Sequence, residues 1–309
     1  MDLATLWFLL IAVLWTGYLV LEGFDFGVGM LMRLLGRDNT DRRLAINTIG
    51  PIWDGNEVWL ITAVGATFAA FPHWYATLLS GFYVPLLLIL VALILRGVSF
   101  EYRHKVDTPR WREGWDRCIE IGSWVPAFLW GVIFANFVRG VEIDGDMQYV
   151  GGLLAIVDPF ALLGGVVTLS LFLTHGAVFL ALKTAGDYQR RAMALAARLA
   201  VPSAVVTAVW VLWAQLAHSR QAWTWIPLAV AAAALVGVVR ATRARREGWA
   251  FTFNAVAIGL VVVLVFGSMF PAVMPATDPA NSLTIANASA SPYSLMIMSW
   301  VALFLVPVV

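Results

Sequence analysis

The sequence predicts an all-α membrane protein with about nine transmembrane helices. Of its 309 residues, 61% are hydrophobic and only 13% are charged. A soluble domain of this size could not bury so much apolar surface. The apolar residues also gather in long segments, most of them of the length that a bilayer-spanning helix needs. We therefore expect a single transmembrane domain over residues 1–309.

The apolar segments follow one another along the whole chain. We expect spanning helices near 4–32, 51–71, 76–100, 115–138, 153–182, 192–217, 222–240, 248–274 and 293–309. A faint parallel repeat relates the motifs Leu21–Phe24 and Thr174–Ala177, since each is followed by basic residues. It favours two four-helix units, about 1–138 and 153–274, plus a peripheral ninth helix at 293–309 whose end the sequence leaves open.

The basic residues predict the orientation. Eighteen of the twenty Lys and Arg residues lie at the ends of odd-numbered helices or in the loops after them, which leaves Arg139 and Arg220 for the other side. The positive-inside rule then predicts an outside N-terminus and four cytoplasmic loops. The first apolar segment is too long for a cleavable signal peptide and contains Glu22 and Asp25, so we expect it to remain as a helix.

Several classes of site are excluded by composition. The single cysteine, Cys118, excludes an internal disulfide and a Cys-rich metal site. A net charge of +1 provides no excess of positive charge of the kind that binds nucleic acid. Of the four histidines, only His175 is expected well inside a helix, whereas His73 and His104 are expected in loops and His218 at a helix end. The chain is therefore a poor haem or metal scaffold by itself.

The segment Gly50–Trp59, at the start of the second helix, contains the most informative polar residues. Asp54 and Glu57 are three residues apart and share a helix face, whereas Trp59 points to another face. Carboxylates at the membrane boundary are costly to bury, so they favour a proton relay. The alternative is that the helix dipole stabilises acids in its first turn, an explanation that suits Asp54 better than Glu57.

The first helix carries a second group of candidate residues. Glu22 and Asp25 share one face, and Gly23 and Gly27 form a Gly-x-x-x-Gly pair that lets another helix approach closely. Acids beside such a contact suggest a proton-accessible seam. Alternatively, the glycines serve packing and the acids pair with an arginine.

Three further ionisable residues lie in apolar segments. Arg96 ends the apolar stretch within the third segment, where it either snorkels to the cytoplasmic interface or pairs with an acid of the first two helices. Glu120 and His175 lie in the fourth and fifth segments. Each is a functional candidate, but a packing role is at least as common for a single such residue, so we assign them no role.

Four motifs together resemble subunit II of the cytochrome bd-type quinol oxidases. They are Glu22–Met30, Asn47–Trp59, Arg96–Lys105 and Met269–Pro275. The resemblance covers essentially the whole chain. It implies a heterodimer in the bacterial cytoplasmic membrane, in which a haem-bearing subunit I holds haem b, haem d and the quinol site. Oxygen is then reduced to water with cytoplasmic protons, which builds proton motive force. Some members also hold a structural quinone or lipid, or a small accessory single-helix subunit.

The resemblance also implies roles for individual residues. Asp54 matches a family aspartate of the proton path, and Trp59 matches a tryptophan of a proposed oxygen channel. Asp25 and Arg96 match positions tied to stability of the haem-containing complex. By position we add Glu57 and Asp25 to the candidate proton path, and we expect Gly23 and Gly27 to support the helix contacts. No catalytic residue is expected in this chain.

Two other functions remain open at this point. A proton-coupled secondary transporter would also bury acids, but it predicts inverted repeats and broken helices near the midplane, whereas the faint repeat here is parallel. A purely structural membrane chaperone for a haem subunit would share the fold and the partner.

Overall fold

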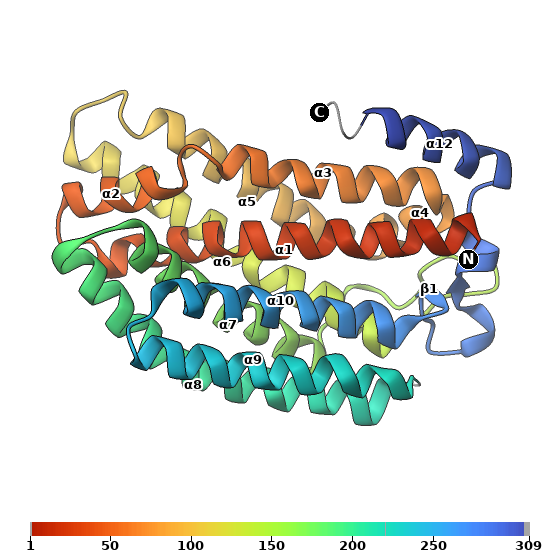
Figure 1. Ribbon diagram of the computed structural model, residues 1–309. Helices are drawn as coiled ribbons and strands as arrows, with labels where there is room; N and C mark the ends of the chain where they lie inside the picture. The colour runs from red at the N-terminus through yellow and green to blue at the C-terminus, as the bar shows by residue number, and fades with distance from the viewer. Residues whose placement is uncertain (1, 220, 306–309) are drawn as a thin grey trace.

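The computed structural model describes residues 2–219 and 221–305, which form a bundle of long helices running side by side (Figure 1). The α-helices are α1 Leu3–Leu35, α2 Asn39–Ile49, α3 Trp53–Ala70, α4 Pro72–Gly81, α5 Tyr83–Tyr102, α6 Pro109–Arg139, α7 Pro159–Lys183, α8 Gly186–Trp213, α9 Trp225–Arg243, α10 Glu247–Met269, α11 Ile285–Ala288 and α12 Pro292–Leu305. Two short strands, β1 Ala272–Met274 and β2 Leu283–Thr284, pair antiparallel.

Seven helices in the described ranges are long and apolar enough to cross a membrane, so the chain is a multi-pass membrane protein. They are α1, α5, α6, α7, α8, α9 and α10, where a short π-helix, Ala214–His218, extends α8 and a short 3-10 helix, Ala222–Thr224, precedes α9. The predicted second span corresponds to α3, and the predicted ninth span corresponds to α12, whose last predicted residues, 306–309, lie outside the described ranges. The total of nine spans stays a prediction.

Local sequence explains where several helices begin. The side chains of Asp2, Asp38, Thr108 and Asp158 each accept a hydrogen bond from a backbone N–H in the first turn of α1, α2, α6 and α7. Such caps satisfy donors that have no partner within the helix. Proline follows the cap in α6 and α7, at the first helical position, where an N–H would have no partner within the helix.

The structure differs from the sequence-based expectation at two connections. The segment after the first span is not a simple loop, because Asn39–Ile49 forms helix α2, which buries Ala45 and Ile49. His73 does not lie in a loop either; it belongs to α4, a short helix that begins at Pro72. Both helices are too short to span a membrane, and the predicted third span, 76–100, takes in the end of α4 together with most of α5.

The arginine-bearing connections gather at one end of the bundle. Helix α2, the α5–α6 loop, the α7–α8 loop and the α9–α10 turn all lie at the left of Figure 1, whereas the N-terminus and β1 lie at the right. Arg220 falls outside the described residues. The predicted orientation requires the basic connections to lie at one end of the bundle, as they do here. Which end faces the cytoplasm stays a prediction.

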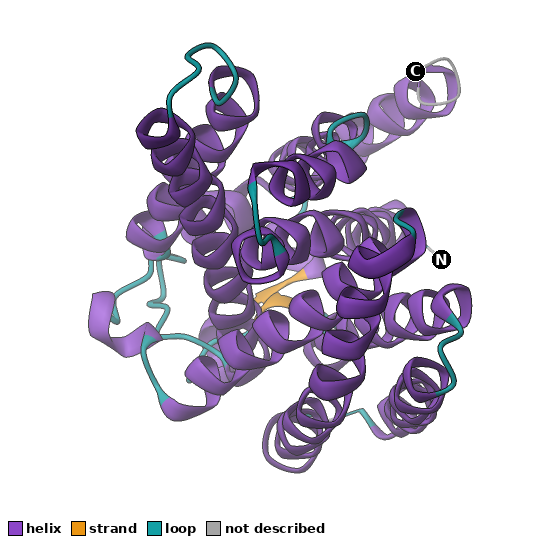
Figure 2. Cartoon of the chain, turned by 90° about the vertical axis from the view of Figure 1, so that its left-hand side faces the viewer, coloured by secondary structure: helices purple, strands orange, loops and turns teal. Residues whose placement is uncertain are grey.

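Helix α1 occupies the centre of the bundle and packs against α3, α6, α7 and α10. Figure 2, which views the molecule from the arginine-rich end, shows most helices of the bundle nearly end-on. Buried aromatic side chains hold α1 against α6. The indole N–H of Trp130 donates to the hydroxyl of Tyr18 at 3.1 Å, and Trp15 packs edge-on against both rings. The division into two four-helix units stays a prediction.

Candidate functional site

The first two turns of α3 place their polar residues in different surroundings. Asp54 is exposed on the isolated chain, and its carboxylate accepts the N–H of Gly55 at 2.9 Å. Asn56 is buried, and the side chain of Glu57 is 23% exposed. Trp59 is partly buried, with its ring against Gly17 of α1. Of the two acids, only Glu57 therefore turns toward the protein interior.

Arg96 joins Glu57 to an acid of α1. Its side chain is fully buried, and Nη2 forms ion pairs with Glu57, at 2.9 Å from Oε1, and with Glu22. Its guanidinium also lies 4.6 Å from the ring centre of Phe26. The snorkelling alternative is therefore wrong. Two carboxylates and an aromatic face compensate the buried charge through Nη2 and the guanidinium plane, whereas Nε and Nη1 have no hydrogen-bond partner within the described chain.

Asp25 does not pair with an arginine. Its Oδ2 accepts a 2.7 Å hydrogen bond from Nδ2 of Asn56, and both side chains are buried. Asn56 is a site residue that the sequence-based reasoning missed. The only available signal was its place between Asp54 and Glu57, because an amide in a helical first turn is as readily explained by capping.

The cluster formed by Glu22, Asp25, Asn56, Glu57 and Arg96 is not saturated. Within the described chain, Glu22 Oε2 and Asp25 Oδ1 are buried and receive no hydrogen bond. Buried polar atoms are usually hydrogen-bonded to protein or water, so each of these two oxygens can still accept a hydrogen bond or a proton. The cluster contains three acids and one arginine, which pairs with Glu22 and Glu57 but not with Asp25, and this excess of carboxylates allows a proton to be held among them.

Close helix contacts fix this cluster in place. Gly27 of α1 faces Gly176 of α7, where a Cβ on Gly27 would lie 2.7 Å from the Gly176 Cα. Gly23 lies against the ring of Phe172, which a Cβ would meet at 2.7 Å. The predicted close approach at this Gly-x-x-x-Gly pair is therefore observed, and its partner helix is α7.

The two residues without an assigned role occupy distinct environments. Glu120 forms an ion pair with Arg33 at 2.7 Å, outside the cluster. His175 is fully buried, and its ring stacks on Phe251 with centroids 4.5 Å apart and an interplanar angle of 13°. Phe24 packs edge-on against the same imidazole at 5.8 Å.

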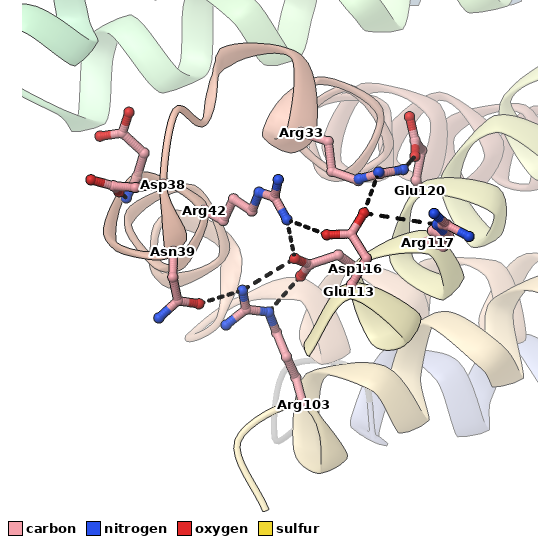
Figure 3. Close-up of polar contacts among 10 residues, drawn as sticks. Arg33, Asp38, Asn39, Arg42, Arg103, Glu113, Asp116, Arg117 and Glu120 are labelled. Carbon is pink, nitrogen blue, oxygen red and sulfur yellow. Dashed lines mark hydrogen bonds and ion pairs between the residues drawn. The ribbon is translucent and has the colours of Figure 1, made fainter. Parts of the chain in front are cut away.

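A second ion-pair network closes the arginine-rich end (Figure 3). Asp116 of α6 is fully buried and accepts from Arg42 of α2 at 3.0 Å and from Arg103, just after α5, at 2.5 Å. Arg42 also pairs with Glu113 at 2.9 Å. Hydrogen bonds from Arg42 to these acids raise its pKa, although partial burial opposes the shift. Arg33 of α1 pairs with Glu113 as well, so this network joins α1, α2 and α6 and the residue that follows α5.

Comparison with known proteins identifies the family. The family described as cytochrome bd terminal oxidase subunit II matches residues 3–309. The chain belongs to this family. Cytochrome bd oxidases are terminal oxidoreductase complexes, so the chain is a subunit of a membrane oxidase.

Relatives within the family match almost the whole chain. Cytochrome bd ubiquinol oxidase subunit 2 of Bacillus subtilis is 44% identical and covers 100% of this chain and 93% of the relative. Cytochrome bd-I ubiquinol oxidase subunit 2 of Escherichia coli is 40% identical, with 98% and 90% covered. A chain of the solved bd oxidase from Geobacillus thermodenitrificans has a TM-score of 0.79 at 19% identity, covering 99% and 96%, which shows the shared fold.

Proposed function

We propose that this subunit II binds a haem-bearing subunit I in the bacterial cytoplasmic membrane and provides proton and oxygen access for quinol-driven reduction of oxygen to water. The relatives from B. subtilis and E. coli are named ubiquinol oxidase subunits. The observation that carries the proposal is the cluster around Arg96, which lies next to the exposed face of α3.

The exposed face of α3 and α5 supports the subunit contact. Asp54, Val58 and Ile61 of α3 are exposed and recur at helical spacing, with 51% and 71% exposure for the two apolar side chains. On α5, Leu90 and Ile94 are each 55% exposed. An ionised Asp54 on a surface that faces lipid would be costly, whereas a polar group of a partner subunit could form a hydrogen bond or ion pair with its carboxylate. We therefore assign this face to subunit I.

The proton path proposed here begins at Asp54 and continues through Glu57. Glu57 is partly exposed at the same face and contacts Arg96, which in turn contacts the buried Glu22. Asp25 lies beside this route and is held by Asn56. Asp54 collects protons at the arginine-rich end, and Glu57 moves them along the subunit boundary. The excess of acids over arginine in the cluster keeps a proton available.

The haems are assigned to subunit I because the surroundings of His175 do not fit a porphyrin. His175 is fully buried, with Phe251 stacked on one face of the imidazole and Phe24 packed against the ring, so a macrocycle would have to displace packed side chains to reach an imidazole nitrogen. Bound in the partner, the b- and d-type haems would supply electron transfer and oxygen reduction. The residues of this chain would supply protons and the protein surface around them.

Trp59 is proposed to border the oxygen route. Its indole is partly buried between α3 and Gly17 of α1, beside the apolar exposed face. Oxygen is apolar and enters most readily from the bilayer. An indole at this position can shape a narrow passage without offering charge.

Two measurements test the proposed function. The first is a reduced-minus-oxidised visible spectrum, with haem extraction, of the complex captured through a tag on this chain. We expect b- and d-type signals that belong to a co-purifying second subunit. A colourless capture from aerated cells expressing both chains would contradict the proposal and favour a proton-coupled transporter.

The second measurement is oxygen consumption by an Asp54→Asn variant, normalised to haem content. The carboxamide keeps the size of the side chain but cannot carry a proton, so turnover should fall while haem content survives. Unchanged turnover would remove Asp54 from the proton path. That result would not contradict the proposed contact with subunit I, because the spectrum of the captured complex tests the contact separately.

A further inference from the structure

A groove on the far side of the bundle from the α3–α5 face lies between α9 and α10, at the arginine-rich end. It has a volume of about 520 Å³, within the range of ligand-binding pockets. Its apolar wall includes Ala233 and Val236 of α9 and Phe253 of α10. Its polar end is formed by Arg240 and Arg246.

The tight turn between α9 and α10 brings these two arginines to the same groove. The N–H of Ala244 donates to the Arg240 carbonyl at 2.9 Å, and the N–H of Arg246 donates to the Ala241 carbonyl at 2.9 Å. The turn passes through a positive φ of 54° at Arg245. Arg240 therefore lies in the last turn of α9 and Arg246 immediately precedes α10, and both side chains line one site.

The wall of the groove depends on a glycine. A Cβ on Gly237 would lie 2.8 Å from the ring of Phe253, so only glycine lets this ring lie against α9. Trp249 lines the groove one turn before Phe253, is 58% exposed and stacks with the Phe253 ring at a centroid distance of 5.7 Å. An exposed tryptophan beside arginines is typical of the depth at which lipid headgroups lie.

The charge in this groove is not neutralised by the chain. Neither Arg240 nor Arg246 forms an ion pair within the described residues, in contrast to Arg33, Arg42 and Arg103 of the network in Figure 3. The adjacent acid, Glu247, accepts a 3.4 Å hydrogen bond from Gln189 of α8.

We propose that this groove binds one anionic glycerophospholipid of the adjacent leaflet. Its phosphate would lie between Arg240 and Arg246, and an acyl chain would follow the apolar wall along Ala233, Val236 and Phe253. Such a lipid matches both ends of the site, the two uncompensated cations and the apolar channel that opens to the bilayer. An apolar helix in the same place would leave the two guanidinium groups without an anion. The proposal does not depend on the oxidase chemistry.

The test is a lipid titration of the purified complex, followed by native mass spectrometry in detergent. The probes are phosphatidylglycerol and phosphatidylcholine, which differ in charge. In the Arg240→Gln/Arg246→Gln variant, affinity for phosphatidylglycerol should fall on the order of tenfold or more, since each arginine contributes roughly a fivefold factor. Its affinity for phosphatidylcholine should not change.

The matched control is Arg243→Gln/Arg245→Gln, which removes the same charge from the same turn but does not alter the groove lining. It should reduce phosphatidylglycerol affinity much less. An Ala233→Phe variant, which fills the apolar wall, should weaken both lipids. Equal losses in the two arginine variants would overturn the proposal in favour of diffuse surface charge. Loss of a small co-purifying polypeptide from Arg240→Gln/Arg246→Gln, with lipid binding retained, would show that the groove holds a helix.

Discussion

Nη2 of Arg96 lies 2.9 Å from Oε1 of Glu57, although 39 residues separate them in the sequence. The same nitrogen pairs with Glu22, so one guanidinium joins α5 to α3 and α1. Glu57 is the partly exposed member of the trio, and the other two are fully buried. A contact of this kind can stabilise the bundle and also connect its surface to buried acids.

Removing the charge of Arg96 alone should destabilise the chain more than removing the charges of Arg96 and Glu22 together. An Arg96→Leu variant leaves Glu22 buried without a cation, at a cost of about 3–5 kcal/mol. We expect less folded protein in the membrane, measured by fluorescence-detected size exclusion. The Arg96→Leu/Glu22→Gln variant should recover much of the yield, and Arg198→Gln, at an exposed position, is the control. A double variant no better than the single one would contradict the paired-charge explanation.

Adding a methyl group at Gly27 should separate α1 from α7. A Cβ there would meet the Gly176 Cα at 2.7 Å and the Phe172 carbonyl even closer, and neither backbone can yield without moving a helix. Gly27→Ala should cost about 1–3 kcal/mol by overpacking. Thermal unfolding of the complex measures this, with Gly114→Ala as the control because its Cβ would meet nothing within 4 Å. Equal melting temperatures for the two variants would refute the close contact.

Asp116 should be a stability residue of the arginine-rich end. It is fully buried and shared by Arg42 and Arg103, so Asp116→Asn breaks a buried network at a cost of about 3–5 kcal/mol. Asp187→Asn, in an exposed pair with Arg37, should cost under about 1 kcal/mol. Limited proteolysis of the α5–α6 loop reports the difference. Similar cleavage rates in both variants would argue against this role for Asp116.

The Asp41–Arg191 pair predicts a pH dependence. Partial burial opposes the shift, but hydrogen bonds from the Arg191 side chain and the Arg37 backbone N–H lower the pKa of Asp41 below 3.8. Because the folded-state pKa is depressed, the stabilisation is present above the unfolded pKa and disappears as pH falls through the folded value. The stability difference between the parent and Asp41→Asn should thus be constant from about pH 5 to 8 and shrink below about pH 4. A difference that grows on acidification would exclude this pair as its source.

Much of the fold could be predicted from the sequence because long apolar segments report the membrane directly. Helix α2 could not, since its 11 residues are short and polar on average, and only Asp38 and the buried Ala45 and Ile49 mark it. The pairing of charges was also beyond reach. Which acid meets Arg96 depends on how three helices are rotated about their axes, and no spacing within one helix fixes that. For the same reason Asn56 was missed, because its partner, Asp25, lies on another helix.

The central claim is that carboxylates of α3 deliver protons to an oxidase whose haems lie in the partner subunit. The most direct test is steady-state oxygen consumption per haem in a Glu57→Gln variant, compared with Glu101→Gln, an exposed acid at the end of α5. We predict a fall of tenfold or more for Glu57→Gln, of the size that general acid–base groups contribute, with unchanged haem spectra and a near-normal rate for Glu101→Gln. Full turnover in Glu57→Gln with intact haems would contradict the claim.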